Sequence, residues 1–444
     1  MSKDQFLSCG VCRQICSSGC QSCNSLVDKQ CIKSQNQKIP FSKIKKKKKI
    51  LSTLDCLISV FIVTPLVVAC WRGTSQLMDV YGEYFPPLES FIIGTLTYIV
   101  IGISQESFHG LINRKHKSWT GTICAFFCMK MYTIVLNAVT NMHWRGGWTI
   151  VEEYFGIHES ETQGYVVNNG RGAFCFFTIC FLLMFSMRCL RNLNSPPFEI
   201  CLDYGDDMFL FPNMFKVKVS EKISLYIFDV VFSIAVVGNL GMTVWQGIWL
   251  LIDLYFFPSN EVFSAWGGLF LGYVIIAIVF LLQPFMKKCC DNLNGIPRLL
   301  VADSYMMFSV LGVILVWRGI WNLLNIYFIT ENEELSYWIS LWVPMLILII
   351  MGCSNSVLVR GVCLDCEEPD GSCVLFPCNY LKTIFDQEKS DTWHSLWTGV
   401  ATNKLEISDI NKSANTKSLS YHSVQIIENS DDLKNNNVER IGIS

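Results

Sequence analysis

One short phrase containing a tryptophan, an arginine and a carboxylate occurs four times in this chain of 444 residues. Its copies begin at Trp71, Trp144, Trp245 and Trp317, and in each an acid or amide follows after eight residues and a tyrosine after ten. A guanidinium and a carboxylate at constant spacing are the two halves of an ion pair, so the expected chemistry is charge pairing. The constant spacing predicts one structural unit that is used four times.

The charged members of the phrase are expected to form a structural polar network. In a helix, the Trp, Arg and acid positions fall on one arc of about 100°, and Gly falls on the opposite side, where a neighbouring helix can approach closely. Arg and acid lie about 10.5 Å apart along the axis, which favours pairing between helices over pairing within one. The predicted network comprises Arg72, Asp79, Arg145, Glu152, Asp253 and Arg318.

Two copies depart from this charge pattern. The third copy has Gln246 in place of Arg, and the fourth has Asn325 in place of the acid. An unpaired charge in apolar surroundings is costly, so the loss of one partner favours the loss of the other. We therefore expect Arg318 and Asp253 to pair or to share one network. Two other roles stay open for the charged residues, namely contact with a substrate and anchoring in an interfacial belt of Trp, Tyr and Arg.

The elements that carry the phrases are long apolar stretches. Apolar residues make up 51% of the chain and charged residues 16%, which argues against a soluble helical protein. A net charge of −2 gives no basis for binding nucleic acid. The sequence predicts an all-α polytopic membrane protein with eight transmembrane helices in the lipid bilayer, at roughly 52–72, 88–107, 122–146, 166–188, 224–248, 263–285, 303–326 and 338–358.

The spacing of the phrases divides the membrane region into two halves. The tryptophans are separated by 73, 101 and 72 residues, and the long interval contains a linker with turn residues. Each half has four helices, so the halves are expected to be parallel, as in some transporters. The predicted domains are a Cys-rich and polybasic cytoplasmic tail (1–50), a four-helix half (51–188), a cytoplasmic linker (189–222), a second half (223–360) and a largely disordered cytoplasmic tail (361–444).

The distribution of lysine and arginine predicts the orientation. A run of lysines at 45–49 precedes the first span, and the loops that follow the phrases carry acids instead. By the positive-inside rule, both termini are cytoplasmic and the four phrases face outside. The lysine run is also expected to contact anionic lipids.

A second set of charged residues lies 14–16 residues before the tryptophans on the same helices: Asp55, Lys130, Asp229 and Asp303. Ionisable groups inside a membrane are candidates for function. The three carboxylates also suit positions near helix N-termini, where the helix dipole favours negative charge. Lys130 has only apolar neighbours in the sequence, so we expect one of the three aspartates to be its partner, in either a structural or a functional role.

The cysteines near the membrane allow two chemistries. Pairs with Cys-x2-Cys spacing can bind zinc, whereas cysteines beside a polybasic run are typical sites of S-acylation. We favour acylation and expect no bound cofactor or metal. The residues are Cys9, Cys12, Cys20 and Cys23 in the first tail, and Cys363 and Cys366 after the last span.

The sequence shows none of the common catalytic motifs, and its six histidines do not converge, so an enzyme is not expected. The remaining classes are a membrane scaffold and a transporter or channel. In the second case the protein would be a secondary transporter of a small or lipidic solute, with the two halves rocking about a central site.

Repeated Trp-Arg-Gly-x-Trp phrases that end in acid-x-Tyr, over about 50–360, resemble the Fuseless family of animal membrane proteins. The departures are Gln246, Asn325 and Ser75, the last in place of the second Trp. The resemblance implies a multi-pass protein of the neuronal plasma membrane at the presynaptic site. It also implies support of calcium-channel organisation and neurotransmitter release, with no catalytic residues to transfer.

Overall fold

The computed structural model describes residues 51–112, 119–160, 164–203, 209–359, 361–368, 370–376 and 380–381. The chain divides into two units, Met1–Cys378 and Asn379–Ser444, and nearly all described residues belong to the first. The cysteines predicted in the first tail, the lysine run at 45–49 and most of the last tail lie outside the described residues.

The described residues contain seven helices that are long and apolar enough to cross a membrane, which agrees with the predicted class. The first is Leu51–Val80, in which α4 (Thr64–Val80) follows a π-helical turn, η1 (Ser59–Val63). The fourth is Ile223–Tyr255, in which a second π-helical turn, η3 (Ser233–Gly238), joins α8 (Ile223–Phe232) to α9 (Asn239–Tyr255). The other five are α5 (Pro87–Ile112), α6 (Trp119–Phe155), α10 (Glu261–Asp291), α11 (Gly295–Tyr327) and α12 (Glu333–Met351).

Two of the helices that carry the phrase contain a π-helical turn at matching positions. Each begins at a serine, Ser59 or Ser233, that lies twelve residues before the tryptophan of its helix. A π-helical turn inserts one residue into the α-helical pattern and is rare. The first and third copies of the phrase are therefore carried by helices with the same irregularity.

The fourth predicted span is shorter than expected. It corresponds to α7 (Gly170–Ser186), an apolar helix of 17 residues. Its expected start near residue 166 is wrong, because Gly164–Val167 forms a strand, β2, that pairs in antiparallel fashion with β1 (Ile157–Ser160). The side chain of Asn169 accepts a hydrogen bond from the Gly172 amide and caps the helix. Eight full-length spans in two halves are therefore not confirmed.

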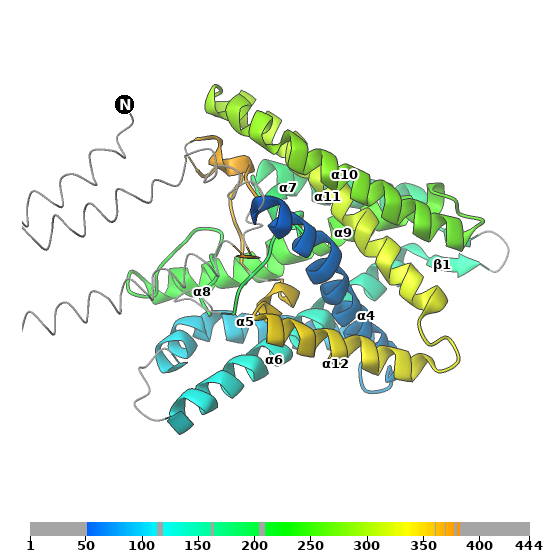
Figure 1. Cartoon of the computed structure of the whole chain (residues 1–444), viewed down its shortest axis with the longest axis horizontal. Coiled ribbons are helices and arrows are strands. Elements are labelled where there is room, and N and C mark those ends of the chain that lie inside the picture. The colour runs from blue at the N-terminus through cyan, green and yellow to red at the C-terminus, as the bar shows by residue number, and fades with distance from the viewer. Residues whose placement is uncertain are drawn as a thin grey trace, which may run out of the picture. The chain divides into compact units, whose positions relative to one another are not determined.

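The four helices that carry the phrase form an inner ring. In cyclic order, α4 contacts α6, α6 contacts α9, α9 contacts α11, and α11 contacts α4. Each outer helix packs mainly against the inner helix that follows it in the chain: α5 on α6, α7 on α9 and α10 on α11. The last helix, α12, packs on the first, α4, and so closes the ring (Figure 1). The four units are thus joined cyclically, and the pairs α7–α9 and α12–α4 cross between the expected halves.

The glycine of each phrase lies where an outer helix crosses an inner one. A Cβ atom added at Gly73 would lie 2.5 Å from the backbone nitrogen of Leu341 in α12, and one added at Gly146 would lie 2.6 Å from a backbone oxygen of α5. Gly247 meets α7, and Gly319 meets α10, in the same way. The sequence prediction that this face admits a close neighbour is confirmed at all four copies.

Two segments that follow α7 and α12 enter the ring at the end opposite the tyrosines. We call residues 187–203 and 352–359 the plug segments. Each contains a short 3-10 helix, η2 (Leu190–Leu193) or η4 (Ser354–Val357), that contacts two inner helices. Their buried side chains fill the space between the inner helices at this end.

The plug segments have matching hydrogen bonds. The carboxylate of Asp365 accepts bonds from the amides of Leu190 and Arg191, the first residues of η2, at 2.7 and 2.8 Å. The carboxylate of Asp203 accepts bonds from the first two amides of η4, at 2.9 and 2.7 Å. Asp203 therefore ties the first plug segment to the second, and Asp365, which follows the second segment, ties the chain there to the first.

Candidate binding site

The first tryptophans of the four phrases form one closed ring about the axis of the inner helices. The ring centroids are 5.6 Å apart for Trp71 and Trp144, 6.1 Å for Trp144 and Trp245, 5.4 Å for Trp245 and Trp317, and 6.1 Å for Trp317 and Trp71. All four contacts are edge-to-face, an arrangement that aromatic quadrupoles favour. Side chains 72 to 246 residues apart in the sequence thus meet at one place.

Backbone carbonyls of the plug segments hold this ring from one side. The indole N–H of Trp71 donates to the carbonyl of Val357 at 2.7 Å, and that of Trp245 donates to the carbonyl of Leu193 at 2.8 Å. Trp317 donates in the same way to the carbonyl of Pro196, at 2.9 Å. These bonds fix the orientation of three of the four indoles.

The second tryptophans form a further tier. Trp249 lies between Trp148 and Trp321, at 6.0 and 6.1 Å between ring centroids. The first copy contributes Ser75 at this level instead of an indole. The second tier is therefore an incomplete ring with three indoles.

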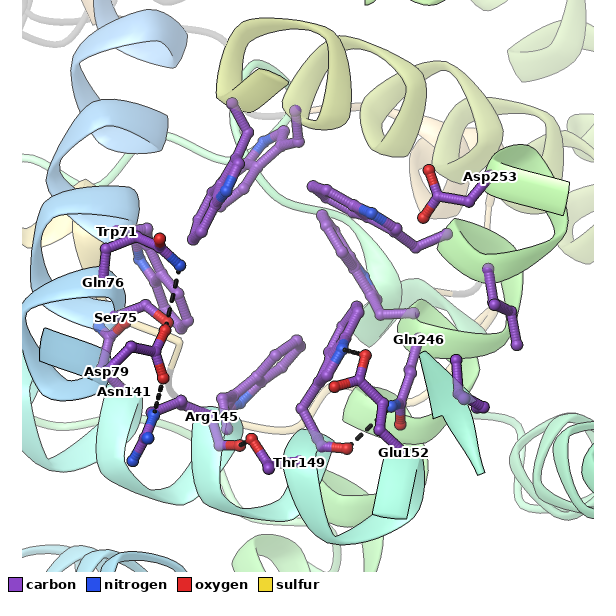
Figure 2. Close-up of a pocket in the computed structure, with 18 of the residues that line it drawn as sticks. Trp71, Ser75, Gln76, Asp79, Asn141, Arg145, Thr149, Glu152, Gln246 and Asp253 are labelled. Atoms are coloured by element: carbon purple, nitrogen blue, oxygen red, sulfur yellow. Dashed lines mark hydrogen bonds and ion pairs between the residues drawn. The ribbon is translucent and has the colours of Figure 1, made fainter. Parts of the chain in front are cut away.

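Both tiers line a cavity of about 470 Å³, which we call the tryptophan cavity (Figure 2). Figure 2 shows its side chains arranged around an open centre. Besides the seven indoles, its polar lining residues include Ser75, Gln76, Asp79, Asn141, Arg145, Thr149, Glu152, Gln246 and Asp253. Three carboxylates and one guanidinium thus face a largely aromatic space.

The arginine of one copy pairs with the acid of the preceding copy. Arg145 Nε lies 2.6 Å from Asp79 Oδ1, which joins the second copy to the first. Arg318 Nε lies 2.6 Å from Asp253 Oδ1, which joins the fourth copy to the third. The expected pairing of Arg318 with Asp253 is therefore present, and it runs between helices as the spacing predicted.

We call each such contact, between the arginine position of one copy and the acid position of the preceding copy, a joint. A neutral version of the joint connects the first copy to the fourth. Arg72 Nε donates to Asn325 Oδ1 at 2.7 Å, and its Nη1 donates to the hydroxyl of Ser340 at 3.0 Å. The guanidinium also lies over the ring of Tyr337, 4.8 Å from its centroid. Although Arg72 is only 2% exposed, dipoles and a ring face replace the carboxylate that the other arginines contact.

The joint between the third and second copies lacks its cation. Gln246, which stands where the other copies have Arg, donates from Nε2 to the carbonyl of Trp148 at 2.9 Å. Glu152 accepts a bond from the indole N–H of Trp148 at 2.7 Å. Among the described residues, Glu152 has no ion pair with Lys or Arg.

The two charge losses therefore do not cancel, contrary to the sequence argument. They fall at two different joints of the cycle, because each arginine faces the preceding copy. One loss leaves Glu152 without a cation, and the other leaves Arg72 without a carboxylate.

Lys130 pairs with a residue that the sequence did not suggest. Its Nζ lies 2.5 Å from Asp203 Oδ2 in the first plug segment, and the two side chains are 10% and 2% exposed. It also donates to the hydroxyl of Ser354 at 3.2 Å. The expected partner was Asp55, Asp229 or Asp303, and the structure places Asp203 there instead.

The three aspartates have separate environments and do not form one site with Lys130. Asp229 accepts bonds from the amides of Phe215 and Val217, at 2.9 and 3.0 Å, and is fully buried. Asp55 is 1% exposed. Asp303 is 3% exposed, and neither of its carboxylate oxygens has a hydrogen-bond partner within the described part of the chain.

Burial also perturbs acids of the segments outside the helices. It raises the pKa of Asp365, against the lowering effect of the amide bonds from Arg191 and Leu190. Burial raises the pKa of Glu199 to about 7, against the lowering effect of the Arg191 charge.

The cysteines after the last span lie close to one another and to other polar groups, and their acylation stays a prediction. Cys363 and Cys366 are half-buried, and the thiol of Cys366 donates to the sulfur of Cys373 at 3.8 Å. This bond raises the pKa of Cys366 and lowers that of Cys373. Within the described ranges, no three His, Cys, Asp or Glu residues are grouped so that they could hold a metal ion.

Sequence reasoning missed the cavity and the two acids that cap η2 and η4, Asp365 and Asp203. The signal for the cavity was present, because the Trp and acid positions share one arc of each helix, and four such arcs facing one axis enclose a space. Asp203 and Asp365 carry no such signal, since each lies in irregular chain that is far along the sequence from the helix that it caps.

The fold and the site define a polytopic α-helical membrane protein built from four units around a tryptophan-lined cavity. The model of the Fuseless family matches residues 50–358, which is more than half of the chain. The protein therefore belongs to the Fuseless family. The chain has no match among curated proteins or among solved structures.

Proposed function

We propose that the protein is a non-enzymatic protein of the neuronal plasma membrane that organises other membrane proteins, calcium channels among them, and supports neurotransmitter release at the presynaptic site. Membership of the Fuseless family supports this role. Both termini face the cytoplasm, and the tryptophan cavity faces outside. The polybasic segment before the first helix contacts anionic lipids of the inner leaflet.

One observation carries the choice of an organising role over transport, namely the way the plug segments lock the centre of the ring. Indole N–H groups of three units bond to plug carbonyls, and Lys130 of the second unit binds Asp203. Rocking of two halves would have to break the three indole bonds and the bonds of Asp203 to the amides of η4, which connect the first half and the segment after it to the second half. A locked centre suits a protein that presents a fixed surface to partners.

The organising role is tested in neurons that lack the protein. We expect fewer calcium channels at release sites and a smaller evoked release, both restored by the wild-type chain. Arg318→Gln, which breaks a joint between units, should restore neither, whereas Glu153→Gln, at an exposed position, should restore both. Normal channel density in the absence of the protein would contradict the proposal.

The orientation is tested by inserting a flexible glycosylation cassette into either of two loops. The loop at 328–332 joins the outer ends of α11 and α12, and the loop at 292–294 joins the opposite ends of α10 and α11. Only the first insertion should be glycosylated. The reverse pattern would place the tryptophan cavity inside the cell.

A second candidate function is secondary transport of a small or lipidic solute. The tryptophan cavity favours it, because it lies on the axis and leads to buried polar residues on α6, where Asn141 bonds to the carbonyl of Asn137 and Asn137 bonds to Thr74. Uptake into proteoliposomes tests it. A solute that enters with the wild-type chain and not with Lys130→Met would support transport.

A further inference from the structure

We propose that the tryptophan cavity is a binding site for a small organic ammonium ion. The inference goes beyond the organising role, and it holds whether or not the ion is carried across the membrane. Three features of the cavity lead to it: aromatic walls, an excess of negative charge, and a position in the repeat where a fixed cation is absent.

The walls favour a cation that is weakly hydrated. The faces of indole rings carry negative electrostatic potential, and they attract ammonium groups while repelling anions. Cages of aromatic side chains are the usual recognition element for quaternary ammonium ions. The seven indoles are those of Trp71, Trp144, Trp148, Trp245, Trp249, Trp317 and Trp321.

The charges of the lining leave one carboxylate without a counter-ion. Asp79 is paired with Arg145, and Asp253 is paired with Arg318 from outside the lining. Glu152 accepts a bond only from an indole N–H. A cation that enters the cavity therefore meets a carboxyl group that forms no ion pair with an arginine or lysine of the described chain.

The repeat itself indicates what is missing beside Glu152. At the three other joints, an arginine side chain lies against the acid or amide of the preceding copy. Here Gln246, one of the residues that line the cavity, takes its place, and its Oε1 is buried without a hydrogen-bond partner in the described residues. Figure 2 shows Gln246 and Glu152 on the same side of the cavity.

The two acceptors suit a ligand that brings the positive charge. Glu152 supplies the charge, and Gln246 Oε1 accepts a hydrogen bond from a protonated amine or meets the polarised methyl groups of a quaternary one. In effect, a diffusible cation occupies the place that a tethered guanidinium occupies in the other units. The proposed ligand is therefore an ammonium ion with a small organic body.

Size and chemistry argue against other occupants. The cavity of about 470 Å³ is of the size that holds small organic ligands, and it is larger than a bare ion needs. Calcium and magnesium bind sites with several oxygen ligands, and the described residues offer no such group here. Anions would face three carboxylates across the lining.

The test uses the purified full-length protein in lipid nanodiscs and the probes choline and tetramethylammonium. Binding is measured by calorimetry and by the change in tryptophan fluorescence. The matched neutral probe is 3,3-dimethyl-1-butanol, which has the shape of choline without the charge. We expect the ammonium probes to bind at least tenfold more tightly than the neutral one. No binding of either ammonium probe at about 10 mM, or equal binding of choline and its neutral analogue, overturns the proposal.

Two variants test the residues. Glu152→Gln should weaken choline binding at least tenfold, whereas Glu153→Gln, the exposed neighbour, should leave it unchanged. Gln246→Arg restores the residue found in the other copies, so it is expected to fold even if Glu152→Gln does not. The restored guanidinium should occupy the site and abolish choline binding. Wild-type affinity in Gln246→Arg overturns the proposal.

Discussion

Removing the guanidinium of Arg318 should be among the most damaging charge changes in this protein. Its Nε lies 2.6 Å from Asp253 Oδ1, and both side chains are 5% exposed. Its Nη2 also donates to the hydroxyl of Ser264 at 2.9 Å. Arg318→Gln would leave the Asp253 carboxylate buried without its cation, which typically costs about 3–5 kcal/mol.

The double variant Arg318→Gln/Asp253→Asn should lose less stability than Arg318→Gln alone. When Asp253→Asn is added, no unpaired charge remains, and buried ion pairs replaced by neutral groups often lose little stability. We expect about 2–3 kcal/mol of the loss to return, within the range of coupling energies measured for residues in contact. The amount returned measures the interaction between the two side chains.

The matched control is the ion pair between the second and first copies. Arg145 and Asp79 have the same Nε–Oδ1 distance of 2.6 Å, but Asp79 is 44% exposed. Water screens such a pair, so Arg145→Gln should cost less than about 1 kcal/mol. The two pairs share residue types and the Nε–Oδ1 distance, and they differ most in the exposure of the acid, 44% for Asp79 against 5% for Asp253.

The assay is the denaturation midpoint of each purified variant in one detergent, together with the fraction of protein that reaches the cell surface. Arg318→Gln should lower both, and the double variant should recover part of each. Strictly additive effects of the two substitutions, or a larger effect of Arg145→Gln than of Arg318→Gln, would refute the reasoning.

Three further predictions concern other parts of the fold. Asp303→Asn should raise the denaturation midpoint, because it replaces a buried carboxylate whose oxygens have no partner among the described residues; a lower midpoint would contradict this. Gly73→Ala should prevent surface delivery, since the new Cβ would lie 2.5 Å from backbone of α12, whereas Gly110→Ala, with no atom within 4 Å, should be delivered normally. The pKa of Glu199 is raised to about 7 in the folded chain, so the free energy of unfolding should fall as pH rises from about 4.5 to about 7. Glu199→Gln should flatten this part of the pH profile of the free energy of unfolding. An unchanged slope would exclude Glu199 as the source of the pH dependence.

The sequence was sufficient for the membrane class, the four units and one specific pair. Apolar stretches of about 20 residues directly predict helices that span a membrane. The helical arc of Arg and acid, together with their separation along the axis, was enough to expect Arg318 to meet Asp253 on another helix, as it does.

The sequence was not sufficient for the order of the units around the ring. Each arginine faces the preceding copy, and nothing in a linear pattern distinguishes this from facing the next one. For that reason the losses at Gln246 and Asn325 were taken as cancelling, although they fall at different joints. Lys130 posed a similar problem, since its partner Asp203 comes from irregular chain that returns into the ring.

The contact between α12 and α4 has a consequence for biosynthesis. The surface of α4 around Gly73 is made to fit a helix that the ribosome produces about 260 residues later. Until then this surface must be shielded by lipid or by an insertion chaperone, and a chain that stops before residue 333 never covers it. Nonsense and frameshift alleles upstream of that point should therefore be retained and degraded in the endoplasmic reticulum. Conversely, a circular permutant that begins at α11 and ends at α10, with α12 joined by a linker to α4, should still assemble.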